Sequence, residues 1–258
     1  MRVTLLGTGD ATGMPAALCD CEYCEQSAPR RRPAVLVESG DTTVVLDIGP
    51  DLVDQLQQTE TYQVDAFFLT HFHRDHADGL LGLLQTLRSG TETAWNGAGD
   101  AHSFDLHMTE TATDHLRDSF DYFLDLLEPT WSPTGVSIGE LEISPFAVEH
   151  MRPEYETVGF VVREGDRAIA YAPDMESFVD EPPATDIDLF VCEGSPFVGL
   201  NHGPADELSA AIAKLDADRT VLVNASEHAR REHTHELEKN AQAAGAELGA
   251  DFEEYTIQ

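Results

Sequence analysis

The sequence has very few positive charges. Its 258 residues include 15 Lys and Arg against 48 Asp and Glu, a formal net charge of −33, and its lysines are Lys214 and Lys239 alone. This deficit argues against long nucleic acid as a substrate, because phosphate binding depends mainly on lysine and arginine. Acidic residues spread along a whole chain are typical of adaptation to molar salt, where the Debye length falls to about 3 Å. We therefore expect a cytoplasmic protein of a halophilic cell.

Long apolar runs are also missing. No run reaches the about 20 apolar residues that a membrane-spanning helix needs, and no signal-peptide pattern is present. The chain shows no linker-like segment, internal repeat or low-complexity tract. With 41% hydrophobic residues it is long enough to bury a large core. We expect one domain over residues 1–258 and no membrane contact; the oligomeric state stays open, with a homodimer as one option.

Cysteine is scarce, and its spacing is informative. Cys19, Cys21 and Cys24 form a Cys-x-Cys-x-x-Cys pattern, whereas Cys192 lies in an apolar run. In a cytosolic chain such spacing favours a metal site over a disulfide framework. We interpret Cys192 as a small buried hydrophobic residue.

The densest group of chemically active residues directly follows the apolar run 64–69. Four candidate ligands occupy six consecutive positions there: His71, His73, Asp75 and His76. Imidazole and carboxylate together suit zinc, manganese or iron. A bound cation would offset the cost of desolvating these groups beside one another. His71 and His73 are two apart and share a direction, while the other two follow a turn, so one loop can serve two neighbouring ions.

Further candidate ligands follow other predicted strands. His150 ends the strand expected over 141–150, and Asp174 follows the strand expected over 168–172. An aspartate between two ions is a common bridging ligand. His202 lies in a loop before a helix, where it is either a general acid for a leaving oxygen or a solvent-exposed loop histidine.

Hydrophobic periodicity predicts alternating strands and helices. Two sheets packed face to face with helices outside are the expected architecture. We expect Gly79 to let the backbone turn as a helix begins, and residues 91–103 to form an exposed loop. The strands are expected at 3–6, 34–38, 43–47, 64–70, 141–150, 158–164, 168–172, 187–192, 220–224 and 252–256, and the helices at 51–58, 77–88, 113–127, 206–215 and 232–244.

The pattern 70–76 with the later His150 and Asp174 resembles the metallo-β-lactamase superfamily. The opening 7–15, the three cysteines, the segment 46–49 and Asn201-His202 are similar to the PhnP-type phosphodiesterases. The resemblance spans nearly the whole chain. It implies an α/β fold of the αββα sandwich type, with two mostly antiparallel or mixed sheets flanked by helices and a binuclear site at its edge.

The resemblance also implies roles for single residues. It assigns one ion to His71, His73 and His150, the other to Asp75 and His76, and makes Asp174 the bridge. A hydroxide held between two divalent ions, zinc or manganese, would attack phosphorus, with Asp75 and His202 as catalytic residues. A structural zinc would be bound by Cys19, Cys21, Cys24 and His228, since a closed set of three cysteines and one histidine is a structural site.

One position departs from that pattern. The family has a Thr-His pair where this chain has Val223-Asn224, so Asn224 would be a weaker, neutral seventh ligand. Alternatively His228 rotates into the catalytic site and leaves the cysteines one ligand short. His233 and His235 are interpreted as surface residues. No role is assigned to His102, His107 and His115.

The function that the resemblance implies is a metal-dependent phosphodiesterase acting on a small cyclic or activated phosphate ester. One alternative is a tRNA 3′-processing nuclease of the same superfamily, which needs a basic arm; the one basic run is Arg30-Arg31-Arg32. Another is a non-hydrolytic relative that serves in binding or cofactor maturation. Such a protein should have lost metal ligands, whereas this chain keeps six of seven.

Overall fold

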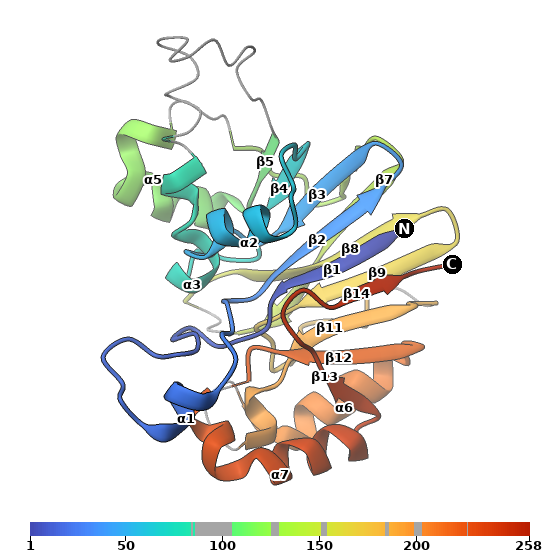
Figure 1. The fold of residues 1–258 in the computed structure, drawn as a ribbon. Coiled ribbons are helices and arrows are strands. Elements are labelled where there is room, and N and C mark those ends of the chain that lie inside the picture. The colour runs from blue at the N-terminus through green and yellow to red at the C-terminus, as the bar shows by residue number, and fades with distance from the viewer. Residues whose placement is uncertain are drawn as a thin grey trace.

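The computed structural model describes residues 1–83, 85, 105–124, 129–150, 154–183, 186–198, 203–225 and 227–258, excluding the side chains of 119–124 and 227–234. Two β-sheets pack face to face, and helices cover both outer faces (Figure 1). This is the expected αββα sandwich. No helix in the described part of the chain is both long and apolar enough to cross a membrane.

The first sheet has six strands in the order β14-β1-β2-β3-β4-β5. Strands β3, β4 and β5 run parallel, and the other neighbouring strands are antiparallel. Its strands are β1 (Arg2–Gly7), β2 (Ala34–Ser39), β3 (Thr42–Leu46), β4 (Ala66–Phe68), β5 (Asp105–His107) and β14 (Glu254–Thr256).

The second sheet has eight strands, with the path β10-β7-β8-β9-β11-β12-β13 and β6 paired to β7. The neighbouring strands β9, β11, β12 and β13 run parallel to one another, so their carboxyl ends lie at the same edge of the sheet. The strands are β6 (Val136–Ile138), β7 (Leu141–Glu149), β8 (Thr157–Glu164), β9 (Arg167–Ala172), β10 (Ser177–Phe178), β11 (Leu189–Glu193), β12 (Arg219–Val223) and β13 (Ala246–Leu248).

Strand β2 shows why these apolar runs form buried strands. Its alternate residues point to opposite faces: Val35 and Val37 enter the core between the sheets, and Ala34 and Leu36 enter the core under the outer helices. Both faces are therefore covered. The helices are α1 (Glu22–Gln26), α2 (Leu52–Gln58), α3 (Arg74–Ala77) and α5 (Glu110–Leu124) on the side of the first sheet or in its loops, and η1 (Ser195–Val198), α6 (Ala205–Leu215) and α7 (Glu227–Ala243) on the side of the second.

Several predicted boundaries were wrong. The helix expected over 77–88 begins earlier as α3, and two turn residues separate it from the helical residues 80–83. The helix expected over 232–244 begins at Glu227. The predicted strand 64–70 pairs only over 66–68. Residues 91–103, expected to be a loop, lie outside the described residues.

Gly79 is a turn residue directly before the helical residues 80–83, as expected, and close packing gives a second reason for glycine there. A Cβ atom at Gly79 would lie 2.1 Å from the carbonyl oxygen of Gly49, and one at Gly49 would lie 2.2 Å from the carbonyl oxygen of Asp75. Glycine is needed here because two backbones approach closely, and no left-handed turn is involved. This contact seats the helix carrying Asp75 and His76 directly on the end of β3.

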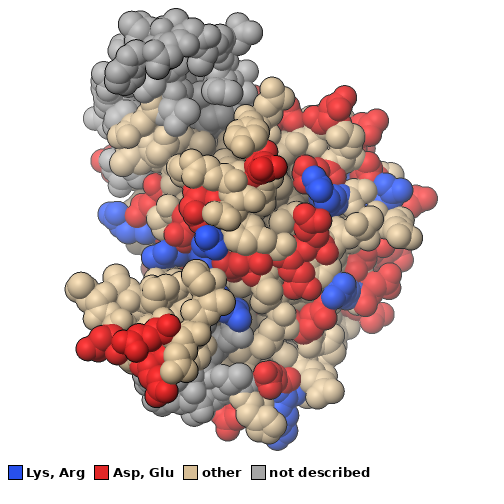
Figure 2. All heavy atoms as spheres, in the orientation of Figure 1, with Lys and Arg blue, Asp and Glu red and all other residues tan. Residues whose placement is uncertain are grey.

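The surface is acidic on the visible face. Figure 2 shows Asp and Glu over most parts of that face, while Lys and Arg occupy a few separate places. The acidic residues therefore do not form a single tail or arm there.

Candidate metal centre

Side chains from both sheets meet at one edge of the sandwich. His71 and His73 lie in the loop after β4 of the first sheet, and Asp75 and His76 lie on α3. His150 follows β7 and Asp174 follows β9, both of the second sheet. The strand ends therefore deliver these six side chains to one place.

The first group contains four candidate ligands whose nearest nitrogen or oxygen atoms all lie within 4.8 Å of one another: His71, His73, His150 and Asp174. The Asp174 Oδ2 atom lies 3.2 Å from His71 Nε2 and 3.8 Å from His150 Nε2. His150 Nε2 lies 3.4 Å from His73 Nδ1. Three imidazoles and one carboxylate around a common centre form a donor set that suits zinc and related divalent ions.

The second group shares a residue with the first. Asp75, His76 and Asp174 also have ligand atoms within 4.8 Å of one another. His76 Nε2 lies 3.0 Å from Asp174 Oδ2 and 3.2 Å from Asp75 Oδ2. Because Asp174 belongs to both groups, its carboxylate lies between two adjacent candidate sites.

Two buried nitrogen atoms indicate that a cation fits here. Within the described part of the chain, His71 Nε2 and His76 Nε2 are buried and have no hydrogen-bond partner, although Asp174 Oδ2 lies 3.2 Å from the first and 3.0 Å from the second. The other ring nitrogens are engaged: His71 Nδ1 contacts Thr70 Oγ1 at 3.0 Å, and His76 Nδ1 contacts Asp47 Oδ2 at 2.8 Å. A buried polar atom without a partner is rare, and a fixed Nδ1 is the usual arrangement around histidine ligands.

Asp47 is a residue of this centre that sequence reasoning missed. It is fully buried and has a positive φ of 68° at the end of β3. Its carboxylate accepts hydrogen bonds from the Thr70 backbone and hydroxyl, both at 2.9 Å, and from the Tyr171 hydroxyl at 2.9 Å, besides its contact with His76. The segment 46–49 carried part of the family resemblance, but no role was given to its aspartate. Tyr171 lies within β9, and no role was predicted for it.

The crowding of charges shifts the pKa values of this cluster. Burial would lower the pKa of His76, but Asp174, Asp47 and Asp75 outweigh it and raise that pKa well above the ordinary value. Burial would raise the pKa of Asp174, but His76 and His71 outweigh it and lower that pKa well below the usual range. Burial and the neighbouring His71 lower the pKa of His73 to about 4. His73 is therefore neutral at pH 7 and can offer a lone pair.

Asn224 contacts the centre through a hydrogen bond to the shared carboxylate of Asp174. It is 3% exposed, follows β12 and has a φ of 55°. Its side-chain nitrogen donates to Asp174 Oδ1, to the Pro173 carbonyl at 3.3 Å and to Glu193 Oε2 at 3.5 Å. In this arrangement the amide orients the shared carboxylate. Glu193, at the end of β11, is a second buried neighbour that the sequence did not single out.

The three cysteines come together away from this centre. The Sγ atoms of Cys19, Cys21 and Cys24 lie within 4.8 Å of one another, and none of the three forms a disulfide. Cys192 is buried in the core, as a small hydrophobic residue would be. The backbone of His228 lies in α7, but its side chain is outside the described part, and so is that of His233. His202 and His102 lie entirely outside it.

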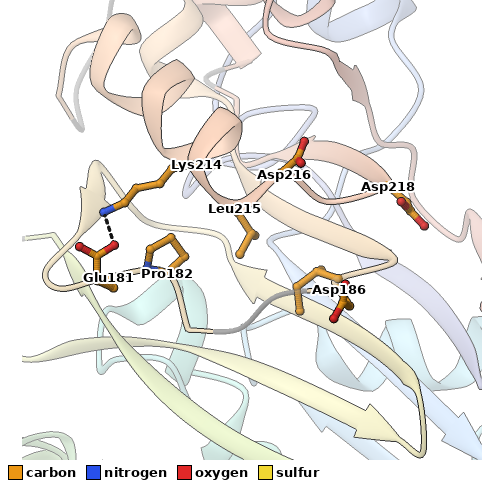
Figure 3. A pocket seen from close by; sticks show the side chains of 8 residues that line it. Glu181, Pro182, Asp186, Lys214, Leu215, Asp216 and Asp218 are labelled. Carbon is orange, nitrogen blue, oxygen red and sulfur yellow. Dashed lines mark ion pairs between the residues drawn. The ribbon is translucent and has the colours of Figure 1, made fainter.

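A separate hollow of about 670 Å³ lies at the other end of the second sheet (Figure 3). It is bordered by the ends of β11, β12 and α6, and Lys214 pairs with Glu181 across it at 2.9 Å. Three further carboxylates line it: Asp186, Asp216 and Asp218. None of the candidate ligands whose side chains are described lines this hollow, so it is distinct from the metal centre.

Sequence comparisons agree with this architecture. A family model described as the beta-lactamase superfamily domain matches residues 42–225. A protein named ribonuclease Z from Thermococcus sibiricus is 28% identical over 175 residues, which are 65% of this chain and 49% of the relative. The chain spans about half the length of the curated relatives it matches. Relatives named ribonuclease Z conflict weakly with the expectation that nucleic acid is an unlikely substrate.

Solved structures show the same fold. A diphosphatase from the PhnP family has a TM-score of 0.74 at 23% identity and covers 100% of this chain and 98% of its own. Zn²⁺-bound PqqB from Methylobacterium extorquens has a TM-score of 0.76 at 18% identity and covers 99% of this chain and 100% of its own. Both neighbours thus share the fold seen in the described residues of this chain.

Proposed function

The chain belongs to the metallo-β-lactamase superfamily, and on this premise we propose that it is a metal-dependent phosphodiesterase acting on a small cyclic or activated phosphate ester. The observation that carries the proposal is the pair of ligand groups joined by Asp174. Divalent ions in such a pair polarise phosphoryl oxygens and supply a nucleophile from water at neutral pH. The metals we propose are zinc or manganese.

Each side chain has a task in this proposal. His71, His73 and His150 would hold one ion and His76 and Asp75 the other, and Asp174 belongs to both groups. The carboxylate of Asp75 is partly exposed, with 16% of its side chain accessible. It can therefore contact a substrate or accept a proton from it. Burial opposes ionisation of Asp75, but the His76 charge outweighs it and lowers the pKa, so Asp75 is ionised at neutral pH. His202 is proposed as the proton donor to the leaving group.

The cysteine group is proposed as a structural zinc site completed by His228. Three thiolates and an imidazole would close a tetrahedral shell with no open position, which fits a structural role. We also propose a high-salt cytoplasm as its setting, on the basis of the net charge of −33.

The test combines metal counting with a diesterase assay. Protein purified in molar salt should contain three metals per chain and hydrolyse bis(p-nitrophenyl) phosphate. Asp75→Ala and His202→Ala should lose most of that activity, while His235→Ala, at an exposed position of α7, should keep it. The proposal is refuted if the wild type binds metal at the cysteine group alone and has no diesterase activity.

A second candidate is RNA 3′-end cleavage, favoured by the relatives named ribonuclease Z. The same metal centre could cleave a nucleic acid phosphodiester, so the two functions share their chemistry and differ in how the substrate is bound. Precursor tRNA offered beside the small ester decides between them. Cleavage of the RNA at much higher kcat/KM than the small ester would replace the first candidate with the second.

A further inference from the structure

Three aromatic rings pack against one another at the metal-ligand loop: Phe72, His115 and Tyr155, here called the aromatic wall. The His115 ring from α5 stacks on the Phe72 ring with centroids 3.8 Å apart and planes inclined by 23°. The Tyr155 ring meets Phe72 edge-on at 4.7 Å. None of the three was singled out by the sequence, because α5 and the segment before β8 are far apart in the chain.

The aromatic wall is fixed relative to the candidate ligands. Phe72 lies between His71 and His73, and its ring centroid is 5.7 Å from that of His73. The segment that carries Tyr155 is tied down at two points: Thr157 Oγ1 donates to the His150 carbonyl at 3.3 Å, and the Val158 N–H donates to the Thr70 carbonyl at 3.1 Å. The wall is therefore held in a fixed position against the ligand loop 71–76.

Core packing explains only part of this arrangement. Phe72 is 8% exposed and packs in the core under the outer helices, together with Leu116 of α5. His115 is exposed and Tyr155 half-buried, so these two rings remain accessible. An exposed imidazole stacked flat on a buried phenyl ring adds little to that core. What it adds is a flat ring surface next to the ligand loop.

The net charge makes such a surface useful for an anionic substrate. The chain carries a formal charge of −33, and Arg74, beside the ligand Asp75, pairs with Asp78 at 3.5 Å while its side chain is 85% exposed. Attraction between phosphate and exposed cations is largely screened at high salt. Stacking on an aromatic ring needs no net charge and contributes binding to any base with a π-face.

We propose that the aromatic wall binds a flat heterocycle carried by the substrate beside its scissile phosphate, as a nucleobase would be. His115 is then a specificity-determining residue, and Phe72 and Tyr155 hold it in place. This inference rests on the proposed function, since it names the substrate class of the same centre.

Two ligands that differ only by a base test the inference. Uridine 5′-monophosphate and ribose 5-phosphate are titrated calorimetrically into the metal-loaded protein in molar salt. The wild type should bind the nucleotide about tenfold more tightly. His115→Ala should remove that difference and leave the affinity for ribose 5-phosphate unchanged, and His115→Phe should retain it. His235→Ala, a matched exposed histidine on α7, should behave as the wild type.

Equal affinity for the two ligands in the wild type, or an equal loss for both in His115→Ala, overturns the inference. The readout is binding, so it separates from the proposed function. If the wild type hydrolyses bis(p-nitrophenyl) phosphate but binds the two ligands equally, the proposed function stands and the base-binding role of the aromatic wall is refuted. If the wild type prefers the nucleotide but has no diesterase activity, the base-binding role stands and the proposed function is refuted.

Discussion

Replacing Asp47 with asparagine tests whether a buried carboxylate behind the ligands controls metal binding. In the wild type, Asp47 Oδ2 faces the Nδ1 atom of His76 at 2.8 Å and the hydroxyl of Tyr171 at 2.9 Å. An amide nitrogen at that position would place donor against donor. The imidazole then gains by moving its proton to Nε2, the atom that must offer a lone pair to a metal.

The magnitude follows from the two disturbed hydrogen bonds. Changes behind a ligating histidine typically cost 10- to 100-fold in metal affinity, or about 1.4 to 2.8 kcal/mol. After the proton moves, His76 Nδ1 accepts from the new amide, so the Tyr171 hydroxyl is the donor left without its acceptor; one such buried donor costs about 1 to 3 kcal/mol in folding stability. Asp47→Asn should therefore weaken zinc binding by about 10- to 100-fold and lower the free energy of unfolding by about 1 to 3 kcal/mol.

Calorimetric zinc titration and urea unfolding in molar salt measure the two effects. Tyr171→Phe removes one donor and leaves His76 paired, so it should cost about 1 kcal/mol of stability with metal affinity nearly unchanged. Asp65→Asn, an exposed aspartate at the other end of the neighbouring strand, is the matched control. If Asp47→Asn binds zinc as tightly as Asp65→Asn, the reasoning about the His76 proton is refuted.

Four further predictions concern the rest of the molecule. Gly79→Ala should strongly destabilise the protein in thermal unfolding because its Cβ would meet the Gly49 carbonyl, whereas Gly82→Ala, in ordinary contact, should be neutral or better; similar melting temperatures would contradict this. Cys24→Ser should remove one zinc per chain by elemental analysis while Cys192→Ala keeps all of it, and equal losses would argue against a cysteine site. The pKa of Glu164 is lowered to about 2 by hydrogen bonds from Ser39 and Arg167 and by the amino terminus. The contribution of ionised Glu164 to the free energy of unfolding is therefore complete above its unfolded-state pKa of about 4.3 and is lost as pH falls toward 2. The difference in unfolding free energy between wild type and Glu164→Gln should shrink from pH 6 to pH 3 in urea titrations. A constant difference would contradict the ion pairing. Melting temperature should rise steadily between 0.1 and 2 M KCl as screening weakens repulsion, and a flat profile would count against salt adaptation.

The sequence revealed the parts of the site that follow from local pattern. Buried strands appear as apolar runs, and polar residues at their ends, such as His71, His150 and Asp174, are then expected at one edge. Asp47 was not recognised, because an aspartate after a strand is usually a turn residue and its four donors come from distant segments. The early start of α7 was missed because residues 227–231 contain almost no apolar residues to show a helical period.

Tertiary contacts add what the pattern did not show. Asn224 was predicted as a weak, neutral ligand, and in the structure its amide nitrogen donates to Asp174 Oδ1; its role as a ligand stays a prediction. The stacking of His115 on Phe72 depends on how α5 packs against the ligand loop, which periodicity does not encode. The roles of His202 and His228 stay predictions.

The placement of the ligands has a mechanical consequence. His71, His73 and His76 extend from the first sheet, and His150 and Asp174 extend from the second, so a bound ion would cross-link the two halves of the sandwich. Binding energy at the centre would then stabilise the packing between sheets, because any ligand of the native state favours folding. A chelator should therefore loosen the whole sandwich, and hydrogen exchange in strands far from the metal would report its occupancy.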